Sequence, residues 1–267
     1  MTSEYKDSQS LSQKPQLKNE FASKRVVKRD FWLIPGYLGF SMLLPIVLSF
    51  FVMLFMVLLT GSSSENEFTR QAMGISQVFA LIGQCLVLLL FYLMHRKTLI
   101  PLAIQRFKDL KKHIVLIVIV FIAMYLLNYA YAFGMEFLPK KYQFDETENN
   151  KQIIQLFKTT WIWPILFLDI VIITPIVEEL LFRHLIIHEL GKKLTYGLMY
   201  VVSVVFFASL HVINATSIFE IGPYLIMATC FVVAYHFSGR NLATTITLHM
   251  INNGISYFTI VGMMLWK

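Results

Sequence analysis

The sequence predicts an all-α, polytopic membrane protein, a helical bundle, and three observations lead to that fold class. The chain is 57% hydrophobic, only 15% charged and rich in phenylalanine, whereas about a quarter of the residues in a soluble domain are charged. Apolar runs of about 20 residues recur along it, and a helix of that length crosses a hydrocarbon core of about 30 Å. Backbone groups in lipid must also satisfy one another within the protein, which favours helices for runs of this length.

The chain is expected to divide into a tail and two sets of helices. Residues 1–28 are polar and mixed in charge, so we expect a disordered basic tail. Residues 29–159 would hold the first three transmembrane helices, and residues 160–267 a catalytic core of four helices in the C-terminal half. The seven predicted spans are residues 36–60, 73–94, 114–134, 161–190, 196–215, 218–237 and 241–265.

The basic residues, which give a net charge of +7, are unevenly distributed between the loops. Lys and Arg gather in the tail, in the loop 95–113, at Lys192 and Lys193 and at Arg240, which lie on one side if the seven helices alternate. The positive-inside rule places that side, with the N-terminus, in the cytoplasm. We therefore expect membrane lipids as partners and no nucleic acid. The length, the basic tail and the absence of a retention signal indicate a bacterial cell membrane.

Polar residues are sparse in the first three spans. Gln84 and Asn128 are expected to form hydrogen bonds between helices. The outer loop 135–160 is the longest and the most acidic loop, and we expect it to cover the outer mouth of the bundle.

Two adjacent glutamates, Glu178 and Glu179, lie in the fourth span together with Arg183. A charge at the centre of a transmembrane helix costs at least about 2.5–3.5 kcal/mol on the insertion scale, so an ordinary solvated surface does not explain them. Glu179 and Arg183 are four residues apart and share a helix face, which leaves Glu178 directed elsewhere. Either the charges form a buried ion pair that fixes helix packing, or Glu178 acts as a general base. The preceding Thr174-Pro175 can kink the helix at this point.

Two later spans repeat a four-residue spacing, with Phe207 before His211 and His249 before Asn253. Each pair alone is also explained by hydrogen bonding or packing between helices. His249 and Asn253 can both donate hydrogen bonds, as an oxyanion hole requires. At 1.5 Å per residue, Glu178 and these polar side chains lie about 14–28 Å from the cytoplasmic headgroups, near the middle of a bilayer about 40–45 Å thick. We therefore expect them to meet in one buried site.

The order E-E-x-x-x-R, F-x-x-x-H and H-x-x-x-N on successive hydrophobic segments resembles the CPBP (Abi) family of intramembrane proteases. That family includes type II CAAX prenyl proteases and bacterial bacteriocin-processing or self-immunity proteins. The resemblance extends from the fourth span to the seventh. One departure is His184, where a glycine often follows the motif arginine, and the stretch Gly239–Leu242 lacks an expected aromatic residue.

The resemblance implies a catalytic role for each motif. Glu178 and His211 would activate the attacking water, and His249 with Asn253 would stabilise the oxyanion. The supporting residues would be Glu179, Arg183 and Phe207.

Competing metal and acid chemistries fit the residues less well. A zinc site of the H-E-x-x-H kind would need a second histidine after His188-Glu189, and the sequence has none there. An aspartyl dyad would need a partner for Asp169, which we expect to be structural.

Zinc nevertheless has two candidate ligand sets. Glu178, His211 and His249 could be three ligands of a zinc ion, although we predict hydrolysis without metal or cofactor. His184 and His188 are a second candidate pair, expected at the lipid interface.

We therefore predict an intramembrane endopeptidase that cleaves a membrane-associated peptide or protein with water activated by glutamate and histidine. The alternative is a non-catalytic membrane scaffold, regulator or bacteriocin self-immunity protein in which the charges are structural. A transporter fits less well, because the ionisable groups lie in one half of the chain without repeated broken helices.

Overall fold

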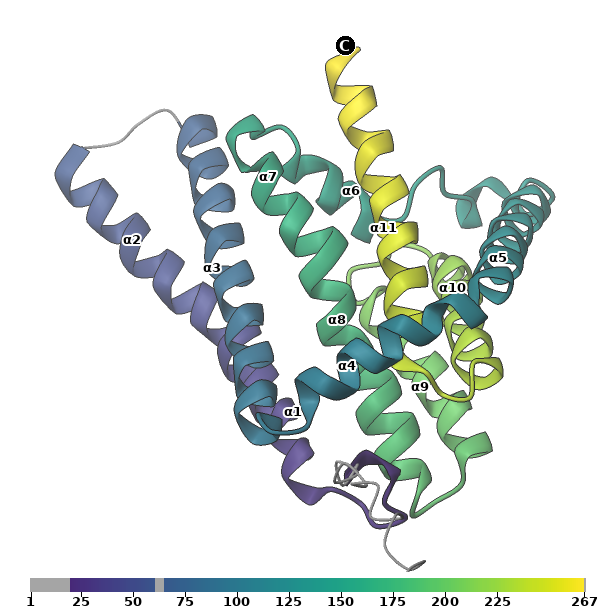
Figure 1. Cartoon of the computed structure of the whole chain (residues 1–267). Helices are drawn as coiled ribbons and strands as arrows, with labels where there is room; N and C mark the ends of the chain where they lie inside the picture. The colour runs from purple at the N-terminus through teal and green to yellow at the C-terminus, as the bar shows by residue number, and fades with distance from the viewer. Residues whose placement is uncertain (1–19, 61–64, 267) are drawn as a thin grey trace, which may run out of the picture.

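The computed structural model describes residues 20–60 and 65–266, and every regular element within those ranges is helical. The predicted all-α fold class is therefore confirmed. Figure 1 shows long helices side by side, with the C-terminus at the end of the bundle opposite the N-terminal segment.

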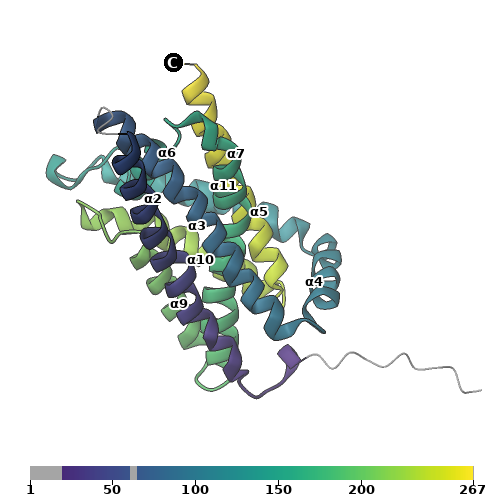
Figure 2. The same ribbon diagram turned by 90° about the vertical axis from the view of Figure 1, so that its left-hand side faces the viewer.

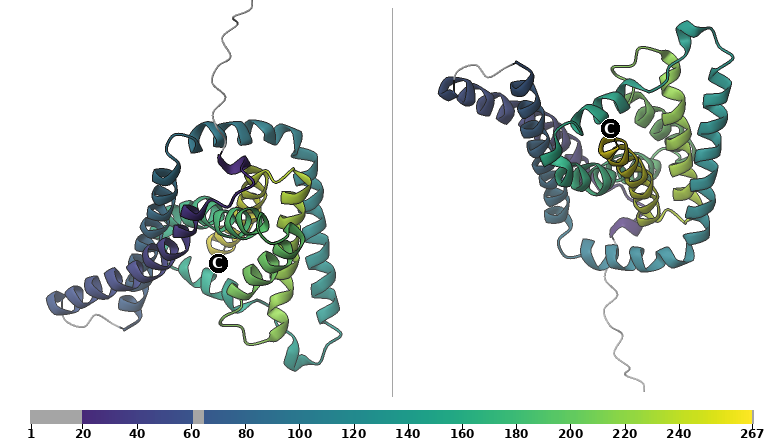
Figure 3. Two further views of the ribbon diagram at one scale, coloured as in Figure 1. Left: turned by 90° about the horizontal axis from the view of Figure 1, so that it is seen from below. Right: turned by 90° about the horizontal axis from the view of Figure 1, so that it is seen from above.

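The N-terminal half forms a helical hairpin, a connecting helix and one further long helix. In the hairpin, a first helix that is π-helical in its middle part packs against α3, as Figure 2 shows from the side. The connecting helix α4 runs along one edge of the bundle from α3 to α5 (Figure 3). The elements are η1 Glu20–Ala22, η2 Lys28–Trp32, α1 Leu33–Gly36, η3 Tyr37–Leu43, α2 Leu44–Thr60, α3 Glu65–His95, α4 Leu99–Lys108, η4 Asp109–Lys112, α5 Ile114–Met135 and η5 Lys140–Tyr142.

The C-terminal half surrounds one long central helix made of α7, η7, α8 and η8, in which η7 and η8 are π-helical. This central helix contacts α3, α9 and α11, and α10 lies against α5, α9 and α11. The elements are α6 Glu148–Leu156, η6 Thr160–Ile162, α7 Trp163–Leu166, η7 Phe167–Ile173, α8 Thr174–Glu179, η8 Leu180–Leu190, α9 Tyr196–Leu210, η9 Ile218–Glu220, α10 Ile221–Phe237 and α11 Leu242–Leu265.

Four helices of the described chain are long and apolar enough to cross a membrane. Their outward side chains are apolar and exposed, as Leu58 (75%) illustrates, and such a surface suits contact with lipid. Each of the seven predicted spans falls on helix, except that α9 ends at Leu210 and leaves residues 211–215 of the span 196–215 outside it; the exact number of spans stays a prediction. The four helices are Lys28–Leu59, Arg70–His95, Ile114–Met135 and Ile218–Phe237, and Tyr196–Leu210 is a shorter apolar helix.

Close approach of helices at small residues holds the bundle together. In lipid the hydrophobic effect does not drive helices together, so packing depends on tight contact. A methyl group on Gly83 of α3 would lie 2.0 Å from the carbonyl oxygen of Phe40, and one on Gly222 of α10 would lie 2.2 Å from Cζ of Tyr131. At both places only a glycine permits the observed spacing.

The N-terminal segment differs from the predicted disorder at residues 20–28, and residues 1–19 lie outside the described residues. The ring of Phe21 packs on His95 and His184, with centroids 4.7 and 5.3 Å apart. The backbone N–H of Val27 donates to Glu189 Oε2 at 2.7 Å. These partners are distant in sequence, so the polar composition of the segment did not reveal them.

Candidate active site

The two adjacent glutamates lie at the end of α8, between the π-helical segments η7 and η8. The proline that was expected to kink the helix, Pro175, is the second residue of α8, just after η7. Proline cannot donate a backbone hydrogen bond, and π-helical turns are frequent at functional sites. The central helix is therefore irregular on both sides of Glu178 and Glu179.

Glu179 forms a buried ion pair with Arg183, and neither side chain has exposed surface. The distance from Arg183 Nη1 to Glu179 Oε1 is 3.1 Å. The guanidinium also lies over the rings of Phe207 and Phe231, 5.1 and 5.4 Å from their centroids. The carboxylate and the two aromatic faces together compensate the charge of a guanidinium removed from water.

His249 lies between the two glutamates. Its Nδ1 donates to Glu179 Oε1 at 3.2 Å, and its Nε2 is 3.6 Å from Glu178 Oε2. The second distance is too long for a direct hydrogen bond. Glu178 is 17% exposed and lines a cavity, so its carboxylate is accessible to a small reactant while Glu179 is not.

His211 follows the last residue of α9, and its ring is held in one orientation. Its Nδ1 donates to the carbonyl oxygen of Phe207 at 2.8 Å. The ring is stacked between Phe207 and Tyr224, with centroids 4.4 and 4.9 Å away. Because a carbonyl only accepts, the proton of the neutral ring is on Nδ1 and the free lone pair is on Nε2.

Asn253 is held by neighbours on both sides of its amide. Its Nδ2 donates to the carbonyl oxygen of Ile170 in η7 at 2.9 Å, and its Oδ1 accepts from Asn252 Nδ2 at 3.2 Å. An amide nitrogen has two hydrogens, so one remains for another acceptor. Asn252 also lines the cavity and was not among the predicted site residues, although a second amide beside Asn253 in an apolar helix was a visible signal.

The predicted catalytic residues all line one cavity of about 590 Å³. The outer loop, which was expected to cover the mouth, contributes lining residues between Phe144 and Phe157. The supporting residues lie behind the described cavity wall and are fully buried. The lining catalytic residues are Glu178, His211, His249 and Asn253, and the supporting residues are Glu179, Arg183 and Phe207.

Glu220 joins two outer segments beside this cavity. Its Oε1 accepts from the backbone N–H groups of Thr216 and Ser217 at 2.9 and 3.0 Å. Its Oε2 accepts from the backbone N–H of Glu148 at the start of α6, at 2.7 Å. One carboxylate therefore joins the loop after α9 to a segment that lines the cavity.

Asp169 has the structural role that we expected. It is buried in the central helix and accepts from Gln77 and Gln84 of α3, the latter at 2.8 Å. The interhelical bond predicted for Gln84 is therefore present. Asn128 differs, because its Nδ2 donates to the carbonyl oxygen of Met124 in its own helix at 2.9 Å and the residue lines the cavity.

Potential metal ligands gather elsewhere. Among the described residues, Asp30, His184 and Glu189 form a group whose ligand atoms lie within 4.8 Å of one another. Glu178, His211 and His249 do not form such a group in the described structure. His184 is buried against Asp30 with Nε2 2.7 Å from Oδ2, and its expected position at the membrane interface stays a prediction.

The fold and the cavity define an integral membrane protein with a cavity lined by polar residues between its helices. Residues 159–255 match the family model described as type II CAAX prenyl endopeptidase Rce1-like, a segment that contains all three motifs. The resemblance to the CPBP family is thereby confirmed for this segment.

A second comparison finds a relative without an assigned function. An uncharacterized protein of Mycoplasma capricolum subsp. capricolum is 30% identical over 165 residues, which cover 59% of this chain and 47% of the relative. The chain thus spans about half the length of the curated relative that it matches. No solved structure matches the chain.

Proposed function

We propose that the protein is an intramembrane endopeptidase of the CAAX-protease type that hydrolyses a peptide bond of a membrane-associated peptide or protein. The observation that carries this proposal is the convergence of Glu178, His211, His249 and Asn253 on one cavity. Ion pairs that only fix helix packing lie in the interior, as the pair of Glu179 and Arg183 does. Glu178 instead faces the cavity, where water and a substrate can reach it.

Glu178 is the general base of the proposed reaction. Its carboxylate takes one proton from water, and the resulting hydroxide attacks the carbonyl carbon of the scissile bond. The Nε2 lone pair of His211 accepts a hydrogen bond from the same water and orients it. When the tetrahedral intermediate breaks down, Glu178 returns the proton to the leaving nitrogen, and a carboxylic acid and an amine are formed.

His249 and Asn253 are the proposed oxyanion donors. Asn253 has one N–H that is not engaged by Ile170. The Nε2 of His249 donates when the ring is an imidazolium, with Nδ1–H directed to Glu179. Glu179 is thus a positioning residue for His249, and Arg183 holds Glu179 in place.

We further propose that the cavity opens on the non-cytoplasmic side of a bacterial cell membrane. The positive-inside rule assigns the basic end of the bundle, with α4 and η4, to the cytoplasm. The outer loop that lines the cavity connects α5 to α7 at the end of the bundle that lies away from α4 and η4. A substrate would therefore reach Glu178 from outside the cell.

The proposal is tested by incubating purified protein in detergent with a peptide library, with and without a chelator. We expect Glu178→Gln to lower cleavage by at least about 10²-fold, the usual contribution of a general base. Glu136→Gln, which removes an exposed acid of the outer loop, should cleave like wild type. Retention of cleavage in chelator would establish that no metal is needed.

Two results would contradict this function. Wild-type rates in a folded Glu178→Gln variant would remove the general base from the mechanism. Failure of the wild-type protein to cleave any peptide, in detergent or in vesicles, would favour a non-catalytic scaffold instead.

A further inference from the structure

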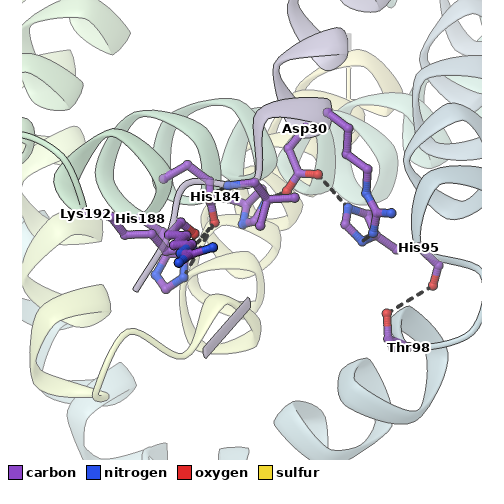
Figure 4. Close-up of polar contacts among 10 residues, drawn as sticks. Asp30, His95, Thr98, His184, His188 and Lys192 are labelled. Atoms are coloured by element: carbon purple, nitrogen blue, oxygen red, sulfur yellow. Dashed lines mark hydrogen bonds and ion pairs between the residues drawn. The ribbon is translucent and has the colours of Figure 1, made fainter. Parts of the chain in front are cut away.

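A second group of ionisable side chains lies in and around η8, the C-terminal part of the central helix (Figure 4). We call Asp30, His95, His184 and Glu189 the inner cluster. All four are buried, and the lining of the cavity contains none of them. Asp30 comes from the N-terminal segment, His95 ends α3, and the other two belong to η8.

Asp30 lies between two imidazoles. Arg29 Nη2 is 2.8 Å from His95 Nδ1, and a guanidinium can only donate, so Nδ1 of His95 is the acceptor. The proton of His95 is therefore on Nε2, which donates to Asp30 Oδ1 at 2.7 Å. His184 Nε2 contacts the other oxygen, Oδ2, at 2.7 Å.

Glu189 faces the same space and keeps capacity to bind a cation. Its Oε1 accepts from Lys192 Nζ at 2.6 Å, and its Oε2 accepts from the N–H of Val27 at 2.7 Å. Each carboxylate oxygen has a second lone pair. One hydrogen bond per oxygen therefore leaves room for a metal bond.

The π-helical geometry of η8 is what brings His184 and Glu189 together. Residues five apart diverge by about 140° on an α-helix. In a π-helix the hydrogen bonds join residues five apart, so these two side chains return to one face. The unusual helix thus builds a two-residue ligand pair that an α-helix with the same sequence would separate.

We propose that Asp30, His184 and Glu189 bind a divalent transition-metal ion of the zinc class. One imidazole and two carboxylates are a ligand set that suits zinc, and ligand atoms in a tetrahedral zinc site are about 3.3 Å apart. The ligand atoms of His184 and Asp30 are 2.7 Å apart, and those of all three residues lie within 4.8 Å of one another, so side-chain rotations can bring them to this spacing. Water would complete the coordination.

The ion takes the place of the proton between His184 and Asp30. His184 binds metal through Nε2 as a neutral ring, its proton moves to Nδ1, and any second proton is released to solvent. His95 remains bonded to Asp30 Oδ1 and orients that ligand from outside. The ion then links the N-terminal segment to the helix that carries Glu178 and Glu179.

The test uses untagged, full-length protein in detergent, stripped with chelator and then titrated with Zn²⁺ alone. We expect one equivalent of Zn²⁺ per chain, retained after desalting. Asp30→Asn and His184→Gln should weaken binding more than hundredfold, and His95→Gln by about 10–100-fold, as replacement of an outer partner does. Two controls should keep the site: His236→Gln changes an exposed histidine at the same end, and Glu178→Gln changes the cavity.

A second measurement does not depend on how the variants fold. Lys24 and Arg25 are exposed in the N-terminal segment, and bound Zn²⁺ should slow tryptic cleavage there in the wild-type protein. The proposal is overturned if wild type binds less than about 0.2 equivalents of Zn²⁺ or if binding survives in His184→Gln. It is also overturned if Zn²⁺ leaves the rate of tryptic cleavage unchanged.

Discussion

Removal of Arg183 tests whether the buried ion pair supports the site, and the structure sets the size of the effect. The pair has no exposed surface and a separation of 3.1 Å. Arg183→Met keeps most of the apolar stem but leaves the Glu179 carboxylate buried without its partner. Breaking such a pair from one side costs about 3–5 kcal/mol, and we expect a loss of that size in the free energy of unfolding.

The double variant Glu179→Gln/Arg183→Met should be more stable than Arg183→Met alone. It removes both charges, so no uncompensated ion is buried, and Gln keeps an oxygen that can accept from His249 Nδ1. The control is Lys151→Met, which breaks an ion pair with Glu148 in which the lysine is 51% exposed. Exposed pairs contribute about 0–1 kcal/mol.

Equilibrium unfolding in mixed micelles with increasing SDS, followed by tryptophan fluorescence, measures these differences. The reasoning is refuted if Arg183→Met loses no more stability than Lys151→Met. It is also refuted if the loss of stability in the double variant equals the sum of the losses in Glu179→Gln and Arg183→Met measured separately. Effects of independent side chains add in that way.

Two further predictions concern packing and catalysis. Gly83→Ala should lower the free energy of unfolding by about 1–3 kcal/mol, because its methyl would meet the backbone of Phe40 and the chain must shift. In the control Gly39→Ala the methyl meets nothing within 4 Å, so this variant should unfold like wild type. Equal unfolding midpoints for the two variants would contradict the close contact at Gly83. Asn253→Ala should lower kcat by about 10²–10³-fold, as loss of an oxyanion donor does, with the folded state checked by thermal unfolding; an unchanged kcat would assign the oxyanion to other donors.

The fold class was predictable because lipid leaves few choices. A run of about 20 apolar residues must satisfy its own backbone, so the predicted spans fall on helices, apart from residues 211–215. The π-helical segments were not predictable from the run around Glu178, because hydropathy is the same in either helix type. The contacts of Phe21 and Val27 also escaped, since their partners His184 and Glu189 are more than 150 residues away along the chain.

Helical spacing predicted part of the candidate site correctly. It placed Glu179 with Arg183 and turned Glu178 away from them, and both features are present. Spacing within one helix carries no information on contacts between helices. For that reason the position of His249 between two carboxylates and the bond from Asn253 to Ile170 became visible only in three dimensions.

The volume of the cavity sets how much of a substrate can lie inside it at one time. A helix 10–12 Å across that rises 5.4 Å per turn fills about 420–610 Å³ in one turn, which is close to the cavity's volume of about 590 Å³. An intact membrane-spanning segment of about 20 residues is several times too long to lie wholly inside it. Under the proposed function, only the residues around the scissile bond would occupy the cavity, and the rest of the substrate would extend beyond it.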